Sequence, residues 1–390
     1  MTIMTSKRLL KPATKSFFLF GPRATGKSTW LKNQVKADIS IDLLKASEYQ
    51  KYSKNISLLR EILEANPKYK KIVIDEIQKL PELLDEVHSL IFDFNNKHRF
   101  ILTGSSARKL KKKNVNLLAG RALLRNFHTY SCLEVADHFN LDQALKFGML
   151  PEVWNIENEA DKKDYLISYV QTYLKEEIQQ EAAVRSLPSY LSFLEHFAIK
   201  NGQVINLQSL SGEIGVARTT IISYLEILEH TLLGFKLAPI HLKAKTKEVS
   251  LPKFYFFDTG VVRALAQNLD NALAEDKGYL LETFILNELK IYSDYNQKRW
   301  EFYYWGTPSL NEVDFIIASG RTHIGIEVKS AKIWKPEFSK GLKTLLDSKK
   351  IVEGVGIYCG DEIIKKDGIT IYPVVKFVEA LHKSRFLTSN

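Results

Sequence analysis

The chain has 390 residues, of which 45% are hydrophobic and 26% are charged, and its formal net charge is +10. This composition is ordinary for a globular protein of two to four domains. The two cysteines, Cys132 and Cys359, exclude a disulfide framework, and a reducing, cytoplasmic location is expected. No apolar run reaches the length of a bilayer span and no signal peptide is evident, so no membrane association is expected.

The basic excess lies in residues 1–135, whereas the rest of the chain is close to neutral. Its densest cluster is Lys109 with Lys111, Lys112 and Lys113. A polyanionic partner would explain this cluster, and so would a solvated loop beside a bound nucleotide.

Residues 21–28 read Gly-Pro-Arg-Ala-Thr-Gly-Lys-Ser and fit the phosphate-binding pattern G-x-x-x-x-G-K-[ST]. A short apolar strand is predicted just before them, at 16–20, and a helix at 28–35. The loop amides and the helix N-terminus then form a cradle for phosphate oxygens. The predicted nucleotide-binding residues are Gly21, Pro22, Arg23, Ala24, Thr25, Gly26, Lys27, Ser28 and Thr29.

A second predicted strand, at 71–76, ends in the carboxylates Asp75 and Glu76. In this arrangement Asp75 holds a Mg²⁺ ion together with the Ser28 hydroxyl, while Glu76 orients or deprotonates the attacking water. Lys27 would neutralise the β- and γ-phosphates. ATP and Mg²⁺ are therefore the predicted cofactors of this segment.

Polar residues follow the next predicted strand, at 99–105. Thr103 or Ser105, at its carboxyl end, would contact the γ-phosphate or the lytic water, or would instead form a turn or helix cap. Arg121 is a candidate arginine finger, acting on the chain's own nucleotide or on that of a neighbour in a homo-oligomer. A surface ion pair is the alternative role for this arginine.

Taken in order, these motifs resemble the bacterial and archaeal AAA-type ATPases that carry a C-terminal domain of unknown function. Besides the phosphate-binding loop, the resemblance rests on Val-Ile-Asp-Glu-Ile-Gln at 73–78, Leu-Thr-Gly-Ser-Ser at 102–106 and Leu-Ala-Gly-Arg-Ala at 118–122. Gly-Met-Leu-Pro at 148–151 resembles that family's Gly-Gly-x-Pro signature, with methionine in place of the second glycine. The resemblance covers nearly the whole chain and implies an AAA-type P-loop ATPase domain over residues 1–135.

The middle of the chain is predicted to be largely helical. Residues 136–200 carry apolar residues at helical spacing and are interpreted as a lid or connector without chemistry. Residues 201–265 are predicted to be a winged helix, in which helices at 207–214 and 217–228 are joined by a turn at Gly215.

Two strands after these helices, at 232–239 and 253–257, are predicted to form the wing. The lysines between them would share one face of an extended segment: Lys243, Lys245 and Lys247. Glu226 and Glu229 on the preceding helix would repel phosphates, so DNA contact is expected to be mostly non-specific. A structural or protein-contact role is the alternative.

Two alternating segments near the end of the chain, at 312–319 and 323–330, are separated by a short turn that contains Gly320 and Arg321. A two-residue connection with glycine first is typical of a type II′ hairpin. Because the turn fixes the pairing of the two strands, the residues that face each other can be read from the sequence.

In that register Asp314 lies across from Glu327, and Glu312 lies across from Lys329. Two opposed carboxylates repel each other, but both would be attracted to a Mg²⁺ or Mn²⁺ ion between them, so this pair would suit a metal site. The spacing Asp…Glu-x-Lys resembles that of PD-(D/E)xK nucleases, in which Asp314 and Glu327 would hold the metal and Lys329 would position or activate the water. A cross-strand ion pair between Glu312 and Lys329, with no catalysis, is the alternative.

A further carboxylate is expected from a preceding helix at 279–289, where Glu282 and Glu288 are available and the family resemblance favours Glu282. Residues 266–390 are therefore predicted to form a restriction-endonuclease-like domain. The whole chain is predicted to be an α/β multidomain protein that couples ATP hydrolysis to DNA binding and to a candidate Mg²⁺-dependent nuclease. The competing interpretation is an ATP-dependent switch whose last domain binds DNA or a protein partner without cleavage.

Overall fold

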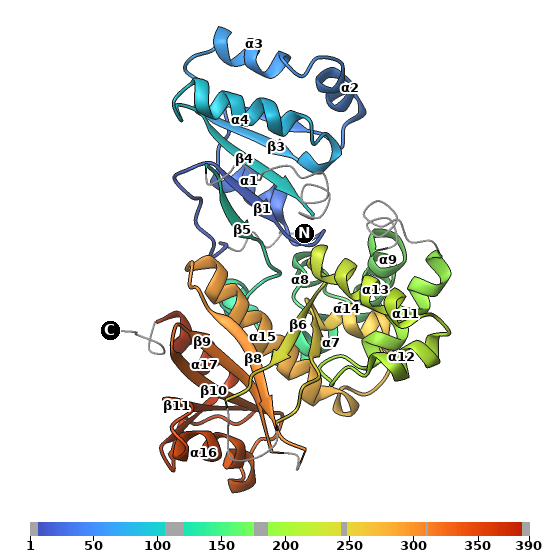
Figure 1. Ribbon diagram of the computed structural model, residues 1–390, viewed down its shortest axis with the longest axis vertical. Helices are drawn as coiled ribbons and strands as arrows, with labels where there is room; N and C mark the ends of the chain where they lie inside the picture. Colours follow the sequence, from blue (N-terminus) through green and yellow to red (C-terminus); the bar gives the residue numbers. More distant parts are fainter. Residues whose placement is uncertain (1–6, 106–120, 175–185, 243–247, 309–310, 384–390) are drawn as a thin grey trace.

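The computed structural model describes residues 7–105, 121–174, 186–242, 248–308 and 311–383. These residues form a five-stranded sheet near the amino end and an eight-stranded sheet toward the carboxyl end. Figure 1 shows the first sheet with its helices at one end of the molecule and the second sheet at the other, with the middle helices beside it. Across the described ranges, no helix is both long and apolar enough to cross a membrane.

The first sheet is entirely parallel, in the order β2-β3-β4-β1-β5. Its strands are β1 Phe17–Phe20, β2 Ile39–Asp42, β3 Lys71–Asp75, β4 Arg99–Gly104 and β5 Leu123–Asn126. Their near-continuous apolar runs suit a sheet that is covered on both faces. The covering elements are α1 Lys27–Gln34, α2 Ala46–Lys54, α3 Leu58–Ala65, α4 Leu83–Asp93 and the 3₁₀ turn η1 Ile77–Lys79. The carboxyl ends of β1, β3 and β4 therefore meet at one edge, where ligands bind in such sheets.

The middle segment consists of short helices that share one hydrophobic core with the C-terminal sheet. They are α6 Cys132–Val135, η3 Ala136–His138, α7 Leu141–Phe147, α8 Pro151–Asn155, α9 Glu159–Ser168, the π-helix η4 Tyr169–Leu174, α11 Leu187–Ile199, α12 Leu207–Ile214, α13 Arg218–His230 and α14 Thr259–Leu265. The predicted helix-turn-helix is present as α12 and α13. Gly215 between them adopts a left-handed conformation with φ of 73°.

The second sheet has the order β12-β13-β11-β10-β9-β8-β6-β7. Its strands are β6 Gly234–Pro239, β7 Lys253–Phe256, β8 Glu301–Gly306, β9 Glu312–Ser319, β10 Thr322–Lys329, β11 Glu353–Tyr358, β12 Ile364–Lys366 and β13 Ile369–Pro373. The accompanying helices are η5 Leu273–Glu275, α15 Lys277–Tyr295, η6 Pro336–Ser339, α16 Lys340–Asp347 and α17 Val374–His382.

The predicted β9–β10 hairpin is confirmed. Ser319 pairs with Thr322, and the register continues without a shift to Phe315 opposite Ile326. Gly320 has a φ of 61°, as the first position of a type II′ turn requires. One further step along the same register sets Asp314 across from Glu327.

The predicted wing is corrected by the sheet order. β6 pairs with β7 as a hairpin, but it also pairs in parallel with β8, at Ala238 opposite Tyr303. The hairpin is therefore part of the C-terminal sheet and does not project as a separate wing. One core runs from Tyr130 to Leu381, so the limits predicted at 200 and 265 fall within it. The lysines predicted for the wing, at 243, 245 and 247, lie outside the described residues, as does the cluster at 109–113.

Candidate functional sites

The loop at residues 21–28 joins β1 to α1 at the carboxyl edge of the first sheet. Gly26 caps α1 with a φ of 91°, a left-handed conformation that favours glycine. A side chain at Gly21 would place its Cβ only 2.2 Å from the carbonyl oxygen of Phe127. Glycine is therefore favoured at position 26 by the backbone conformation and at position 21 by the close approach of Phe127.

Lys27 is buried, and its ammonium lies over the loop. Its Nζ donates to the carbonyl oxygens of Gly21 and Pro22, at 2.7 and 2.9 Å. Thr25 Oγ1 also donates to Pro22 O, at 2.8 Å. These bonds place the cation where β- and γ-phosphate oxygens would lie in a loop of this type. Ala24 and Thr29 are exposed.

Ser28, Asp75 and Thr103 come from three elements and meet at the sheet edge. Ser28 Oγ donates to Asp75 Oδ2 at 2.9 Å, and the Thr103 hydroxyl donates to Asp75 Oδ1. Thr103 Oγ1 also accepts the backbone N–H of Glu76. The hydroxyl and the carboxylate are both oxygen ligands of the kind that Mg²⁺ prefers, so this pair fits that ion.

Glu76 is buried and adopts a left-handed backbone conformation, with φ of 59°. Its Oε2 accepts a hydrogen bond of 2.6 Å from the Gln78 amide, which also donates to Ser105 Oγ at 3.2 Å. Gln78 was not predicted as a site residue. The available signal was a polar residue that follows the carboxylate pair after one isoleucine.

Arg121 lies just before β5. Because β5 is parallel to β1, this position is at the amino edge of the sheet, opposite the phosphate-binding loop. Its guanidinium contacts His88 Nε2 and the ring of Phe92, both on α4. Arg121 is therefore badly placed to act on the chain's own nucleotide. Action on a neighbour's nucleotide stays a prediction, beside the alternative of a surface role in contact with α4.

Arg8 connects the phosphate-binding loop, through Thr25, to residues of the middle segment and to α15. Its guanidinium donates to Thr25 O at 3.0 Å, to His128 O at 2.6 Å and to the Tyr295 hydroxyl at 3.2 Å. Its Nε lies 3.1 Å from Glu134 Oε2. Since Tyr295 is the last residue of α15, the loop contacts the end of that helix through one side chain.

Glu288, on α15, is not part of the predicted metal site. Its carboxylate accepts hydrogen bonds of 2.7 Å from the Ser131 hydroxyl and from the Cys132 backbone N–H. Burial raises the pKa of Glu288 to about 7, although these hydrogen bonds oppose the shift. Its position indicates that it attaches α15 to the start of α6, which leaves Glu282 as the helical carboxylate of the pocket.

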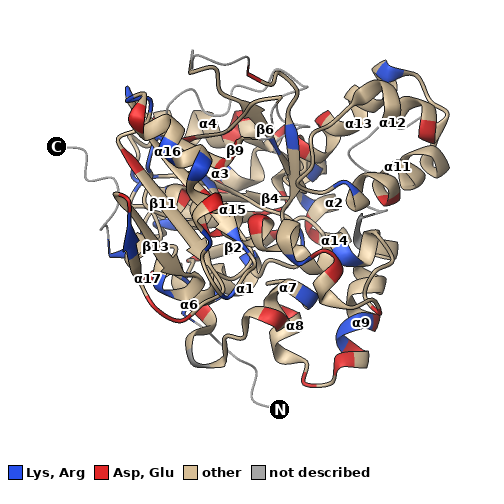
Figure 2. Cartoon of the chain, turned by 90° about the horizontal axis from the view of Figure 1, so that it is seen from below, with Lys and Arg blue, Asp and Glu red and all other residues tan. Residues whose placement is uncertain are grey.

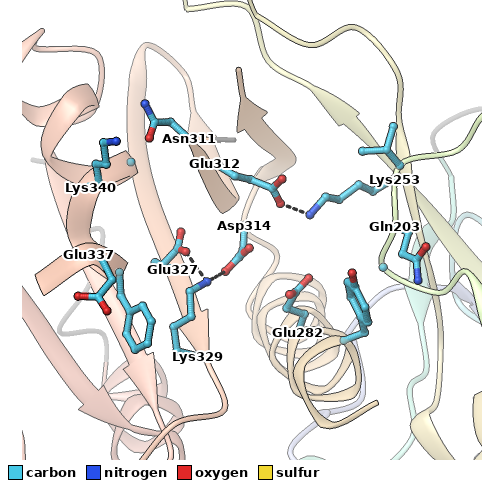
Figure 3. Close-up of a pocket in the computed structure, with 15 residues that line it drawn as sticks. Gln203, Lys253, Glu282, Asn311, Glu312, Asp314, Glu327, Lys329, Glu337 and Lys340 are labelled. Atoms are coloured by element: carbon cyan, nitrogen blue, oxygen red, sulfur yellow. Dashed lines mark hydrogen bonds and ion pairs between the residues drawn. The ribbon is translucent and has the colours of Figure 1, made fainter. Parts of the chain in front are cut away.

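The second candidate site is a cavity of about 730 Å³ on one face of the C-terminal sheet (Figure 3). Two strands each supply two residues spaced two apart, which places both side chains on the same face: Glu312 and Asp314 on β9, and Glu327 and Lys329 on β10. β7 supplies Lys253, and α15 adds Glu282 from above the sheet.

Lys329 connects the two opposed carboxylates. Its Nζ contacts Glu327 Oε1 and lies 3.5 Å from Asp314 Oδ2. Burial opposes the charged form of Lys329, but the neighbouring carboxylates outweigh it and raise its pKa. The alternative prediction, an ion pair between Glu312 and Lys329, is not observed, because Glu312 pairs with Lys253.

Two carboxyl groups in this cavity resist ionisation. Burial and the charge of Asp314 raise the pKa of Glu282 to about 8, and the same two causes raise that of Glu327. Glu327 Oε2 is buried without a hydrogen-bond partner among the described residues. An unpaired buried oxygen beside a second carboxylate is suited to a divalent cation.

The cavity is not a preformed metal-coordination site. In the part of the chain that is described, no three His, Cys, Asp or Glu side chains are gathered as ligands of one ion. The ammonium of Lys329 lies between Glu327 and Asp314 instead (Figure 3). A metal at Asp314 and Glu327 would therefore have to displace the Lys329 ammonium.

Lys253 and Tyr255 were not predicted as site residues. The Tyr255 hydroxyl donates to Glu282 Oε2 at 2.7 Å, and Lys253 forms an ion pair with Glu312. A lysine at the start of the apolar run Phe-Tyr-Phe-Phe was the available signal, because a charge in a buried strand requires a partner.

Three family models match consecutive parts of the chain. Residues 13–136 match a model described as an AAA domain. Residues 138–272 and 277–377 match two models described as domains of unknown function, DUF8612 and DUF4143. The N-terminal segment is therefore an AAA-type P-loop domain, in agreement with the prediction, and its parallel α/β sheet confirms that part of the fold class.

The chain is also similar to uncharacterized proteins of Mycobacterium bovis and Mycobacterium tuberculosis. Each is 26% identical over 298 residues, which are 74% of this chain and 65% of the relative. An uncharacterized protein of Methanocaldococcus jannaschii is 24% identical, covering 70% of this chain and 66% of its own. The chain thus spans slightly less than two thirds of the length of the mycobacterial relatives.

Two solved structures overlap the chain in part. A RuvB variant of Thermotoga maritima has 15% identity and a TM-score of 0.27, covering 57% of this chain and 81% of its own. The replication initiator DnaA, bound to AMPPCP and single-stranded DNA, has 14% identity and a TM-score of 0.28, covering 56% and 83%.

Proposed function

Because residues 13–136 form an AAA-type domain, we propose that the protein binds and hydrolyses ATP with Mg²⁺ and uses its C-terminal cavity as a metal-dependent DNA nuclease. The observation that carries the nuclease proposal is the unpaired, buried Glu327 oxygen beside Asp314, with Lys329 in contact with both carboxylates. Such a cluster combines oxygen ligands with a cation that can face a phosphate.

In the first site, the contacts support the following roles. Lys27 binds the β- and γ-phosphates, Ser28 and Asp75 hold the Mg²⁺ ion, and Thr103 keeps the Asp75 carboxylate turned toward it. Glu76 accepts the proton of the attacking water, and the Gln78 amide holds the Glu76 carboxylate in place.

In the second site, Asp314 and Glu327 hold the metal, with Glu282 as a further carboxylate above them. A divalent ion here would polarise the scissile phosphate and lower the pKa of a bound water. Lys329, once displaced from Glu327, is the cation closest to that phosphate. DNA is the proposed substrate because a cavity with flanking lysines suits a phosphodiester.

Contact with DNA outside the cavity is proposed to be mostly non-specific. In Figure 2, α12 and α13 carry both acidic and basic segments rather than a continuous basic stripe. Arg218, Ser223 and Glu226 are exposed on α13, while Ile221 and Leu228 are buried. Base-specific recognition by this helix therefore has little support.

The competing function is an ATP-dependent switch whose cavity binds DNA or a protein partner without cutting. The ion pairs of Lys329 with Glu327 and Asp314 favour it, because they neutralise the carboxylates without a metal. Plasmid DNA incubated with Mg²⁺ or Mn²⁺, with and without ATP, separates the two functions. We expect nicking by the wild type and by Lys332→Ala, an exposed control, and its loss in Lys329→Ala. Equal behaviour of the wild type and Lys329→Ala would exclude the nuclease.

The nucleotide site is tested separately. Lys27→Ala removes the buried ammonium beside the loop carbonyls, so tight ATP binding should be lost, whereas Lys32→Ala on the exposed side of α1 should bind normally. Fluorescent-nucleotide titration measures both. Affinity that does not change when Mg²⁺ is chelated would contradict the assignment of Ser28 and Asp75.

A further inference from the structure

One wall of the C-terminal cavity comes from the middle segment. β7 contributes Lys253, and the neighbouring loop contributes Gly202, Gln203 and Val204. This loop pairs with β7, through Gly202 N to Phe254 O at 2.8 Å and Ile205 N to Pro252 O at 2.8 Å. Lys253 therefore lies on a strand whose outer edge is covered by this loop, and its side chain lines the cavity.

The charge of Lys253 is maintained by the site. Only 4% of this residue is exposed. Burial alone would favour the neutral amine, but Glu282, Glu312 and Asp314 outweigh it and raise its pKa. The Nζ also lies 5.2 Å from the centre of the Tyr304 ring. A buried lysine that stays fully charged is ready to bind an anion.

Lys253 and Lys329 stand on opposite walls, with Asp314 and Glu282 between them (Figure 3). Lys329 is held by the two carboxylates of the proposed metal site. Lys253 contacts Glu312, whose side chain is 38% exposed at the mouth of the cavity. An anion can displace Glu312 without uncovering a buried charge, because that carboxylate can turn into solvent.

We propose that Lys253 binds a DNA phosphate adjacent to the phosphate at the metal. The bound phosphate replaces Glu312 as the partner of the Lys253 ammonium. The proposal rests on the proposed function of the cavity and adds a substrate-binding residue from a different segment of the chain. The Lys253–Glu312 ion pair holds the site closed to anions until DNA arrives. Glu312 then competes with the substrate, and its charge weakens binding.

This exchange predicts opposite effects for the two partners of one ion pair. Lys253→Met should weaken binding of a short fluorescein-labelled single-stranded DNA, in the presence of Ca²⁺ to prevent cleavage, by about tenfold or more. The slope of log affinity against log salt should fall by about 1, as for the loss of one phosphate contact. Glu312→Gln should tighten binding severalfold, because the competing carboxylate is gone. Lys253→Arg should retain the salt slope.

A purely structural ion pair would give a different pattern. Both Lys253→Met and Glu312→Gln would then lower the thermal unfolding midpoint, and both would leave DNA affinity and its salt slope unchanged, which would overturn the proposal. Mn²⁺ titration of the same variants separates this failure from that of the proposed function. Mn²⁺ affinity should be unchanged or higher in Lys253→Met, because a cation has been removed. A wild-type protein that binds neither Mn²⁺ nor DNA at this cavity would contradict the proposed function itself.

Discussion

Glu76 is the residue whose geometry is most closely tied to hydrolysis. Its left-handed backbone and the Gln78 hydrogen bond fix the carboxylate at the edge where Asp75, Ser28 and Thr103 meet. We expect Glu76→Gln to keep ATP affinity within a few-fold of the wild type and to reduce turnover by about 10²- to 10⁴-fold, the usual contribution of a general base. Equilibrium binding and steady-state phosphate release measure the two quantities. Turnover equal to that of the wild type would remove Glu76 from this role.

The Glu282 carboxyl makes stability depend on pH. Burial and the charge of Asp314 raise its pKa to about 8 in the folded protein, whereas the ordinary value is 4.5. Between these values the folded state keeps a proton that the unfolded state has lost, so stability should fall as the pH rises through this window. In EDTA, the thermal unfolding midpoint should decline from about pH 5 to pH 8.

Glu282→Gln should flatten that decline, while Glu275→Gln, at an exposed position, should not. Buried Asp258 and Glu288, whose pKa values are raised to about 6 and about 7, contribute in the same direction. A slope unchanged by Glu282→Gln would show that this carboxyl is already ionised at neutral pH.

At the scale of single residues, sequence reasoning succeeded where a motif fixes a position relative to a turn. The glycines of the phosphate-binding loop and the Ser28–Asp75 contact follow from the motif and the strand order. Lys253 and Tyr255 did not, because their partners Glu312 and Glu282 are distant in sequence. Gln78 is only two residues from Glu76, but no charge or motif position marked its amide as a partner of that carboxylate. Arg121 shows the reverse case: its motif suggested a role, but the parallel pairing of β5 places it at the far edge of the sheet.

The helix α15 connects the two candidate sites. Glu282 near its start enters the C-terminal cavity, Glu288 holds α6, and Tyr295 at its end contacts Arg8 behind the phosphate-binding loop. A 19-residue helix transmits a shift at one end to the other because its backbone is hydrogen-bonded throughout. This arrangement gives a physical route by which nucleotide binding can alter the cavity.

We expect ATP to change the Mn²⁺ affinity of the cavity, with a coupling of about 1–3 kcal/mol. Tyr295→Phe removes the hydroxyl that accepts from Arg8 and from His128 N, so it should reduce that coupling while nucleotide affinity stays close to that of the wild type. Tyr49→Phe, on the exposed side of α2, is the control. Mn²⁺ titrations with and without a non-hydrolysable ATP analogue measure the effect. The same coupling in Tyr295→Phe and the wild type would exclude this route.

At the scale of elements, the β9–β10 hairpin could be predicted in register because its turn chemistry is local. The β6–β7 hairpin was also predicted as two strands, but its partner was not. Parallel pairing of β6 with β8 depends on residues more than sixty positions apart, and no local pattern encodes it.

The described residues form two hydrophobic units, one around each sheet, rather than four. The first sheet has two cores of its own. The middle helices share one core with the C-terminal sheet, which has a second core against α16. The sequence motifs indicated four segments because each motif identifies a local functional pattern. Such patterns do not show which segments pack into the same hydrophobic core.

A fragment of residues 277–383 should therefore fail to fold, since it lacks β6, β7 and the helices that cover α15. A fragment of residues 129–383 should fold cooperatively. Circular dichroism and thermal melts of the two fragments test this. A folded, soluble 277–383 fragment would show that the middle segment is not needed for the core.

The contacts between β7 and the rest of the cavity restrict which substitutions can occur independently during evolution. Lys253 and Tyr255 belong to the segment matched by one family model, while their partners Glu312 and Glu282 belong to the segment matched by another. Loss of Glu312 alone would leave the buried Lys253 charge without its partner, and loss of Glu282 alone would leave the buried Tyr255 hydroxyl without its acceptor. Among relatives of this architecture, positions 253 and 312 should therefore change together. Recombination between the two segments should be tolerated only when both residues of each contact come from the same parent.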